Sequence, residues 1–309
     1  MKLQEFFQKY PDETSCIKAI REYREKQGVI CIRCSYTEHY FRQTDLLYQC
    51  KSCGSRQSLR RGTVMVKSKL PLSYWFYTMY LLSRSKKPIS ALQLQKDLGH
   101  KFYGPIWYML HKLRSIMGKR ENRYTIKEYI ELDEGFFEST REKGEKKAEK
   151  EGLKRGRGSK RQSKVLVAIE SIPVEAKDKY GVERKCGYVK MQVIEDLTSE
   201  TINETVRSMV EKQSTIETDG YRGYSRLKNV ILNHKITVAE NSKQVSKIFP
   251  WVHTAIGNAK RCINGIHHSV SKKYLQNYLN EFCYKFNRRY FGDRLFDRLL
   301  TIAVLYTWF

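Results

Sequence analysis

Residues 129–138 read YIELDEGFFE, and apolar and acidic residues alternate along them as they do in a β-strand. Alternate residues from Tyr129 would share one face, which carries Asp133, and the residues between them would share the other, which carries Glu134. An acid in a hydrophobic strand is costly unless it pairs or binds a metal. Asp133 is therefore either a strand-end acid in solvent or part of a metal site, whereas Glu134 should face away and matter less.

Length and charge set the broad class of the protein. The 309 residues suffice for about two domains, and 58 Lys and Arg against 33 Asp and Glu give a net charge of +25. This excess indicates a polyanionic partner, with nucleic acid ahead of an anionic membrane. No apolar run approaches the roughly 18 residues that span a bilayer, and the N-terminus lacks the apolar core of a signal peptide. We expect a soluble, cytoplasmic protein that binds DNA or RNA and no membrane.

Four of the eight cysteines form two CxxC pairs separated by 15 residues: Cys31, Cys34, Cys50 and Cys53. Each pair places two thiolates on one turn, and two such turns complete a tetrahedral zinc site. A redox-active CxxC is the alternative, but the hairpin-like stretch between the pairs favours zinc, with His39 a less favoured ligand. Four protein ligands leave no open position, so the zinc would be structural. The remaining cysteines are scattered and are interpreted as small apolar residues.

A helix-turn-helix pattern follows the cysteine region. A helix starting at Pro71 precedes two more helices, over residues 89–98 and 104–117, which are joined by a short Gly-bounded turn. The second of these would present Lys112 and Arg114 to DNA. Any compact helical domain contains such turns, but the charge of the chain and the neighbouring zinc ribbon favour DNA binding.

Residues 141–164 contain eleven Lys or Arg, four Glu, four Gly and no aromatic residue. This composition cannot bury a core and predicts a mobile loop, whose excess positive charge suits a phosphate backbone. The expected DNA contacts outside the helix-turn-helix are Arg155, Arg157, Lys160, Arg161, Lys260 and Arg261.

From Lys164 onward the order of elements is that of a mixed α/β domain. Strands are expected over KVLVAIES and KCGYVKMQVIED, then a helix opened by Thr198, two short strands over STIETDGY and NVILNH, and helices to the end. This order suits a mixed α/β nuclease layer rather than a doubly wound nucleotide-binding fold. Neither GxGxxG nor GxxxxGKS/T occurs, which argues against a nucleotide-dependent motor.

Two later residues are candidate partners of Asp133. Asp219 ends the strand over STIETDGY before a Gly turn, where it either caps that turn or faces an active site. On the helix PWVHTAIGNAKRCING, Asn258 shares an apolar stripe with Trp251, Ala255 and Cys262. Asn258 is thus a hydrogen-bonded core residue or a ligand. Two strand acids and one helix-borne oxygen suit Mg²⁺ or Mn²⁺, which can activate a water or 3′-hydroxyl in phosphodiester transfer.

Several motifs occur in a defined order: CxxC…CxxCGS, SKLPLSYWF, ISALQLQKDLG, ELDEGFFE, the basic Gly-rich stretch, TDGYRGY and WVHTAIGNAKRCINGIHHSVSKKYLQNYLNEFCYKFNRR. They cover nearly the whole chain and resemble prokaryotic insertion-sequence transposases with a zinc ribbon and an RNase H-like catalytic domain; the last motif is the most specific. The resemblance implies that Asp133 and Asp219 match the first two catalytic acids of the DDE/D transposases. It also implies that Asn258 stands where the third acid, usually Glu, should fall, as in the D-D-N branch.

The third position leaves alternatives open. Asn offers a neutral carbonyl oxygen and should hold a metal ion less tightly than a carboxylate. The best substitute acid is Glu281. Against it, the aromatic residues of its helix, Tyr274, Tyr278, Phe282 and Phe286, are expected to pack in the core, which would leave Glu281 on a solvated flank. His253, His267 and His268 could contact DNA near the site, but a single His has many structural uses.

The expected fold class is α+β multidomain. N-terminal helices and a zinc ribbon would occupy residues 1–68, the helix-turn-helix segment 69–124, and an RNase H-like mixed α/β domain with C-terminal helices 125–309. The resemblance implies a DNA transposase that cleaves and joins an insertion sequence at its terminal inverted repeats, with structural Zn²⁺ and catalytic Mg²⁺ or Mn²⁺. Its partners would be double-stranded DNA, at the element's ends and at the target, and further copies of the chain in a homodimer or higher oligomer. The alternatives are a catalytically inactive, transposase-derived DNA-binding regulator, which Asn258 keeps open, and a structure-specific nuclease or resolvase.

Overall fold

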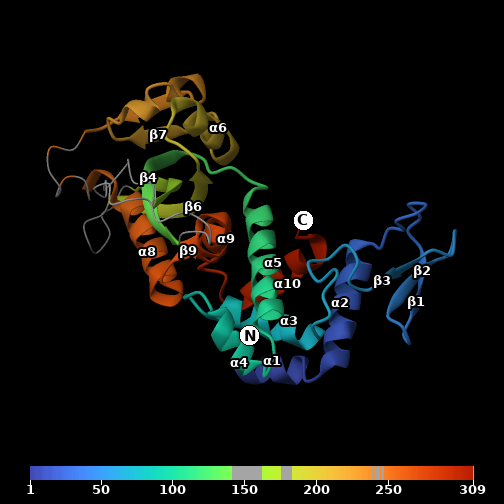
Figure 1. The fold of residues 1–309 in the computed structure, drawn as a ribbon. Helices are drawn as coiled ribbons and strands as arrows, with labels where there is room; N and C mark the ends of the chain where they lie inside the picture. Colours follow the sequence, from blue (N-terminus) through green and yellow to red (C-terminus); the bar gives the residue numbers. More distant parts are fainter. Residues whose placement is uncertain (141–161, 175–182, 239, 241–243, 245–246, 309) are drawn as a thin grey trace, which may run out of the picture. The chain divides into compact units, whose positions relative to one another are not determined.

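The structure is a computed structural model that describes residues 1–140, 162–174, 183–238, 240, 244 and 247–308 (Figure 1). The chain divides into two compact units, Met1–Lys119 with Tyr290–Phe309 (unit 1) and Arg120–Arg289 (unit 2). The last helix, expected within the catalytic domain, is thus part of unit 1. Within the described ranges, no helix has both the length and the apolar character that crossing a membrane requires.

Unit 1 has a helical core formed by both ends of the chain. Its helices are α1 (Leu3–Lys9), α2 (Glu13–Gln27), α3 (Leu72–Arg84), α4 (Ala91–Asp97), α5 (Tyr103–Glu121, which runs on into unit 2) and α10 (Leu295–Leu305). Helix α10 packs against α2 and α3, and the rings of Phe6, Phe76 and Phe296 meet there. Asp12 caps α2 by accepting a hydrogen bond of 2.8 Å from the Ser15 amide.

A small antiparallel sheet carries the paired cysteines. Its strands β1 (His39–Arg42), β2 (Leu47–Cys50) and β3 (Arg56–Ser58) lie in sequence order, with Phe41 opposite Tyr48. The hairpin expected between the two CxxC pairs is confirmed.

Unit 2 is built on a mixed sheet in the order β6-β5-β4-β7-β8. The strands are β4 (Tyr129–Thr140), β5 (Gln162–Pro173), β6 (Arg184–Ile194), β7 (Thr215–Thr218) and β8 (Asn233–Ile236). Strands β4, β5 and β6 are antiparallel, whereas β7 and β8 run parallel to β4. The short β9 (Val270–Ser271) pairs with the end of β4. This order, with β4 at the centre, is consistent with the RNase H-like domain predicted from the sequence.

Helices cover both faces of this sheet. Helices α8 (Pro250–His267) and α9 (Lys272–Asn287) share one apolar core with Phe137 and Val167. Helix α6 (Ser199–Met209) shares the other core with Ile130 and Leu132. The two faces of β4 are therefore those predicted from the alternation in YIELDEGFFE.

Two details of unit 2 differ from the prediction. The strand expected over NVILNH begins only at Asn233, because a 3₁₀ turn, η3 (Leu227–Asn229), precedes it and the apolar Val230 and Ile231 enter the core under the sheet instead. In α9 the fully buried stripe contains Leu275, Leu279 and Cys283, while the aromatic residues expected to form the core lie at its margin.

Candidate active site

Asp133 and Asp219 come together because β4 and β7 are neighbouring parallel strands. Glu131 of β4 lies opposite Glu217 of β7 in this pairing. Asp133 comes two residues after Glu131, and Asp219 comes two residues after Glu217. Each carboxylate is oriented by a backbone amide: Asp133 Oδ1 accepts from Glu134 N at 2.8 Å, and Asp219 Oδ1 accepts from Tyr221 N at 3.0 Å. Both acids therefore lie on the same side of the sheet, near the carboxyl ends of two of its central strands. Ligands bind at such strand ends in open α/β sheets.

A cavity of about 610 Å³ opens over the two carboxylates. Its polar lining includes Asp133, Asp219, Arg222 and His253, and its apolar lining includes Leu132, Val238 and Phe249. Its volume lies within the range of ligand-binding pockets in proteins, roughly 300–1,000 Å³.

His253 is the side chain of α8 that reaches the acids. Its Nδ1 lies 3.4 Å from Asp133 Oδ2. Partial burial lowers the pKa of His253 below its usual value, and the charge of Asp219 opposes this only in part. Its surroundings therefore favour the neutral imidazole, the form that can serve as a metal ligand.

Glu131 fixes the start of the helix that carries His253. Its buried Oε2 accepts from the backbone amides of Trp251 and Val252 at 3.0 and 2.8 Å, two donors that a helix start leaves without a partner. Arg184 Nη1 lies 3.7 Å from the other carboxylate oxygen. Burial raises the pKa of Glu131, while these amides and Arg184 act in the opposite direction. The sequence interpretation missed Glu131, although it precedes Asp133 on the same face of the same strand.

We expect Glu131→Ala to lower the free energy of unfolding of unit 2 by about 3 kcal/mol, because it leaves the two α8 amides without their buried acceptor and removes one of the two carboxylates beside Arg184. Denaturant titration of the full chain would measure the loss. Glu138→Ala is the matched control, because Glu138 is exposed on the same strand and should change stability by less than about 0.5 kcal/mol. Equal stability of the two variants would contradict the capping role.

Close contact with β4 sets the rotation of α8. A Cβ added at Gly135 would lie 3.4 Å from Ile256 Cγ2, so the missing side chain lets the helix approach. Further along, Lys260 Nζ lies 5.7 Å from the centre of the Phe137 ring. His253, Ile256 and Lys260 therefore form the face of α8 that follows β4.

Asn258 lies on a different side of α8. At about 100° per residue it is turned about 140° from His253, and it is not among the residues that line the cavity. Its Oδ1 accepts a hydrogen bond of 2.8 Å from Arg261 Nη2. Glu281 is buried in α9, rather than on a solvated flank, and forms an ion pair of 2.7 Å with Lys285.

Glu134 faces away from the cavity, as predicted. It is buried on the opposite face of the sheet, where its Oε2 accepts a hydrogen bond of 2.6 Å from the Tyr224 hydroxyl. Burial, reinforced by the charges of Glu134 and Asp133, raises the pKa of Tyr224. Glu134 thus supports the fold beneath the site instead of lining it.

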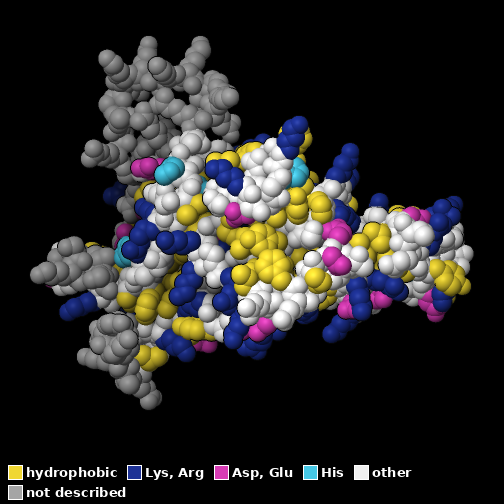
Figure 2. Space-filling view, turned by 90° about the horizontal axis from the view of Figure 1, so that it is seen from below, with side chains coloured by type: hydrophobic (Ala, Val, Ile, Leu, Met, Phe, Trp, Pro, Cys, Tyr) yellow, Lys and Arg dark blue, Asp and Glu magenta, His cyan; other side chains and the backbone are white. Residues whose placement is uncertain are grey.

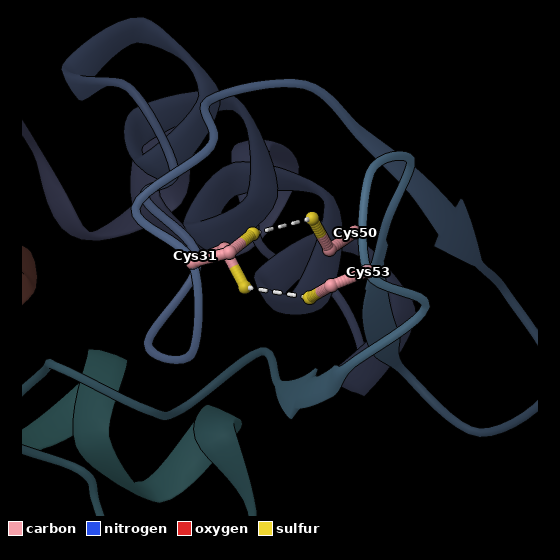
Figure 3. A group of neighbouring side chains, drawn as sticks. Cys31, Cys50 and Cys53 are labelled. Carbon is pink, nitrogen blue, oxygen red and sulfur yellow. Dashed lines mark hydrogen bonds between the residues drawn. The ribbon is translucent and has the colours of Figure 1, made fainter.

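The paired cysteines form a second candidate site, in unit 1 (Figure 3). The sulfur atoms of Cys31, Cys34, Cys50 and Cys53 all lie within 4.8 Å of one another, and no other group of three or more His, Cys, Asp or Glu ligands in the described ranges is as close. The Cys31–Cys53 and Cys34–Cys50 sulfurs are 3.6 Å apart, far beyond a disulfide and close to the roughly 3.8 Å edge of a tetrahedron with 2.3 Å Zn–S bonds. Backbone amides of Cys34 and Arg33 lower the pKa of Cys31 to about 6, which favours the thiolate that a metal binds. The cluster can hold a metal ion, and His39 is not part of it.

The expected DNA-contacting residues have different surroundings. Lys112 and Arg114 are buried and donate hydrogen bonds to the carbonyl groups of Val66 and Ile89, because α5 is enclosed from Met109 onward. On α8, Lys260 is half-buried and Arg261 is exposed. Arg155, Arg157, Lys160 and Arg161 lie outside the described residues. Elsewhere, Lys and Arg side chains are spread over the face of the molecule in Figure 2, among hydrophobic patches.

Comparison with known proteins gives one match to a family. A family model described as the ISXO2-like transposase domain matches residues 125–287, which is more than half of the chain. No curated protein matches. Among solved structures, the chain is similar to a pre-cleavage Mos1 transpososome, with 9% identity, a TM-score of 0.26, and coverage of 74% of this chain and 77% of that one. A Mos1 strand transfer complex is similar with 10% identity and a TM-score of 0.25, covering 74% of this chain and 76% of that one.

Proposed function

Because this chain belongs to the ISXO2-like transposase family, we propose that it cleaves an insertion sequence at its terminal inverted repeats and joins the freed ends to target DNA. The observation that carries the proposal is the cavity that brings Asp133, Asp219 and His253 together at the centre of the sheet. Such a group of proton-accepting and metal-binding side chains in one cleft is typical of an active site.

Asp133 and Asp219 would hold the catalytic metal. Two carboxylates on neighbouring strands repel each other without a cation, and their hard oxygen donors suit Mg²⁺ or Mn²⁺. When bound, such ions lower the pKa of a water or 3′-hydroxyl and stabilise the leaving oxygen. The amides of Glu134 and Tyr221 fix the orientation of the two carboxylates, so the acids meet an incoming phosphate in a defined geometry.

We propose His253, rather than Asn258 or Glu281, as the third metal-facing side chain. It lies beside Asp133 and lines the cavity, whereas the oxygen of Asn258 is bonded to Arg261 and Glu281 is paired with Lys285. Imidazole is a softer donor than carboxylate, so this site should prefer Mn²⁺ over Mg²⁺ more strongly than a site with three carboxylates.

His253→Ala should reduce cleavage by more than about 100-fold, since even the outer partners of metal ligands are worth 10- to 100-fold. His253→Glu should keep cleavage and shift the preference from Mn²⁺ toward Mg²⁺, because it restores a hard oxygen donor. Asn258→Ala is the matched variant on the same helix and should cleave nearly as well as the wild type. Full cleavage by His253→Ala together with loss in Asn258→Ala would assign the third position to Asn258.

The DNA would be bound by unit 1 and by α8. Zinc in the four-cysteine cluster would order the ribbon, and the helix-turn-helix would read the inverted repeats. The second helix of such a motif contacts bases with its N-terminal residues, and in α5 these residues are exposed, including Tyr103 and Tyr108. They replace the buried Lys112 and Arg114 as proposed contacts, while Lys260 and Arg261 would bind phosphates next to the cavity. Pairing of two element ends would require at least a dimer.

The direct test uses purified protein, Mn²⁺ and a labelled duplex carrying the inverted repeats that flank the gene. We expect strand cleavage at the repeat end and joining to a second duplex. Binding without cleavage would instead identify a DNA-binding regulator. Cleavage of branched DNA without joining would identify a structure-specific nuclease or resolvase.

A further inference from the structure

Arg222 faces the same cavity as the two acids, and the mechanism above gives it no role. In the described part of the chain, it is the only Lys or Arg that lines this cavity. It follows Asp219 by three residues and opens the 3₁₀ turn η2 (Arg222–Tyr224). Its side chain is exposed, so the lining of the cavity includes a positive group as well as two negative groups.

The backbone at Arg222 is fixed by contacts of the residues that precede and follow it. Before it, the Tyr221 amide donates to Asp219 Oδ1 at 3.0 Å. After it, Gly223 has no room for a side chain, because a Cβ there would lie 2.9 Å from the Leu197 carbonyl oxygen. The next residue, Tyr224, is anchored to Glu134 by its hydroxyl. A fixed backbone with an exposed side chain is suited to binding a partner at a constant distance from Asp219.

Within the described residues, Arg222 forms no ion pair, whereas two other arginines of unit 2 do. Arg226, four residues later, pairs with Glu200 at 2.5 Å, and Arg184 pairs with Glu217 at 2.9 Å. The charge of such a guanidinium is not compensated by a neighbouring carboxylate, so it can attract an anionic ligand.

We propose that Arg222 binds the non-bridging oxygens of a DNA phosphate at or next to the cleaved bond. This assignment rests on the proposed function, since it takes DNA as the substrate of the cavity. The planar guanidinium donates two parallel hydrogen bonds to a phosphate. It also offsets the repulsion between the DNA backbone and the two carboxylates. Arg222 thereby determines which phosphate along the strand is presented to Asp133 and Asp219.

Binding to the inverted-repeat duplex at several salt concentrations, without added divalent metal, tests the contact independently of cleavage. Arg222→Gln should reduce the slope of log K against log[salt] by about 0.9, the value for one phosphate contact. Arg226→Gln removes another exposed cation from the same loop, one that is paired with Glu200, and should leave the slope unchanged. An unchanged slope in Arg222→Gln, or an equal change in Arg226→Gln, would overturn the proposal. Absence of cleavage by the wild type would overturn only the proposed function.

Neutral methylphosphonate substitution locates the phosphate. A methylphosphonate at one position, at or beside the cleavage site, should weaken DNA binding by the wild type. At that same position it should not weaken binding by Arg222→Gln, which has already lost the contact. Arg222→Lys should retain the salt slope but lose at least tenfold in cleavage, because an ammonium cannot form the two-pronged contact. Methylphosphonates that weaken both proteins equally at every position would exclude a contact through Arg222. Thermal unfolding should be the same for all these variants, since the substituted side chains are exposed.

Discussion

Asp133→Asn and Asp219→Asn are each expected to abolish DNA cleavage and strand transfer while leaving binding to the inverted repeats intact. Each substitution keeps the size of the side chain but replaces a carboxylate by a neutral amide, which binds a hard divalent ion more weakly. The two acids extend from neighbouring parallel strands into one cavity, so neither can substitute for the other. The rate should fall by more than about 100-fold, beyond the loss typical of partners outside the metal's ligand set.

Gel assays with end-labelled substrate measure this loss, and competition binding confirms that the protein still recognises DNA. Glu138→Gln is the appropriate control, because Glu138 lies on β4 and is exposed away from the cavity. Glu134 is a poor control, since its removal leaves the buried Tyr224 hydroxyl without its acceptor and lowers stability. Unchanged strand transfer in either aspartate variant would contradict the assignment of that aspartate as a metal ligand.

The positions of the two aspartates could be predicted from the sequence because short-range rules govern them. The period of two along YIELDEGFFE determines which face of β4 carries Asp133, and the Gly turn after Asp219 marks the end of β7. Their meeting depends on β4 and β7 being neighbours, which the mixed α/β order of elements favours.

The rotation of α8 could not be predicted in the same way. Helical periodicity shows which residues share a stripe but not which stripe faces the sheet. The stripe that contains Asn258 and the one beside it, with Val252, Ile256 and Ala259, are both largely apolar. Its rotation is set by contacts from distant parts of the chain: the close approach at Gly135 and the capping of the first turn by Glu131. These contacts bring His253 to the cavity and turn Asn258 away.

The charge of the side chains did not correctly predict which residues of α5 are exposed. Lys112 and Arg114 were expected at the surface because ionised side chains are rarely buried without partners. Both find backbone carbonyl acceptors inside unit 1, and Lys112 also lies over the Trp308 ring. Trp308, near the C-terminus, is therefore part of the surroundings of Lys112. A contact so distant in the sequence cannot be predicted from the local pattern of α5.

Removal of the metal from the four-cysteine cluster should unfold the ribbon. We expect Cys50→Ser to lose one equivalent of zinc and the three-stranded sheet with it, because strands of three or four residues with a single buried aromatic ring, Tyr48, are too small to be stable alone. Structural zinc contributes about 10–16 kcal/mol in comparable small modules. Arg24 stacks on Tyr48 and donates a hydrogen bond to the Leu59 carbonyl, but one arginine cannot replace a contribution of that size.

Zinc release by a thiol reagent gives the stoichiometry, and hydrogen exchange followed by mass spectrometry reports each sheet separately. Amides of β1–β3 should lose protection in Cys50→Ser while those of β4 and β5 remain protected, because the sheet of unit 2 has its own two cores. Cys262→Ser is the matched control, since Cys262 lies outside the cluster, and it should retain zinc. Specific binding to the inverted repeats should be lost with the ribbon. Protection of β1–β3 that survives complete removal of zinc would show that the arginine contacts and the small core suffice.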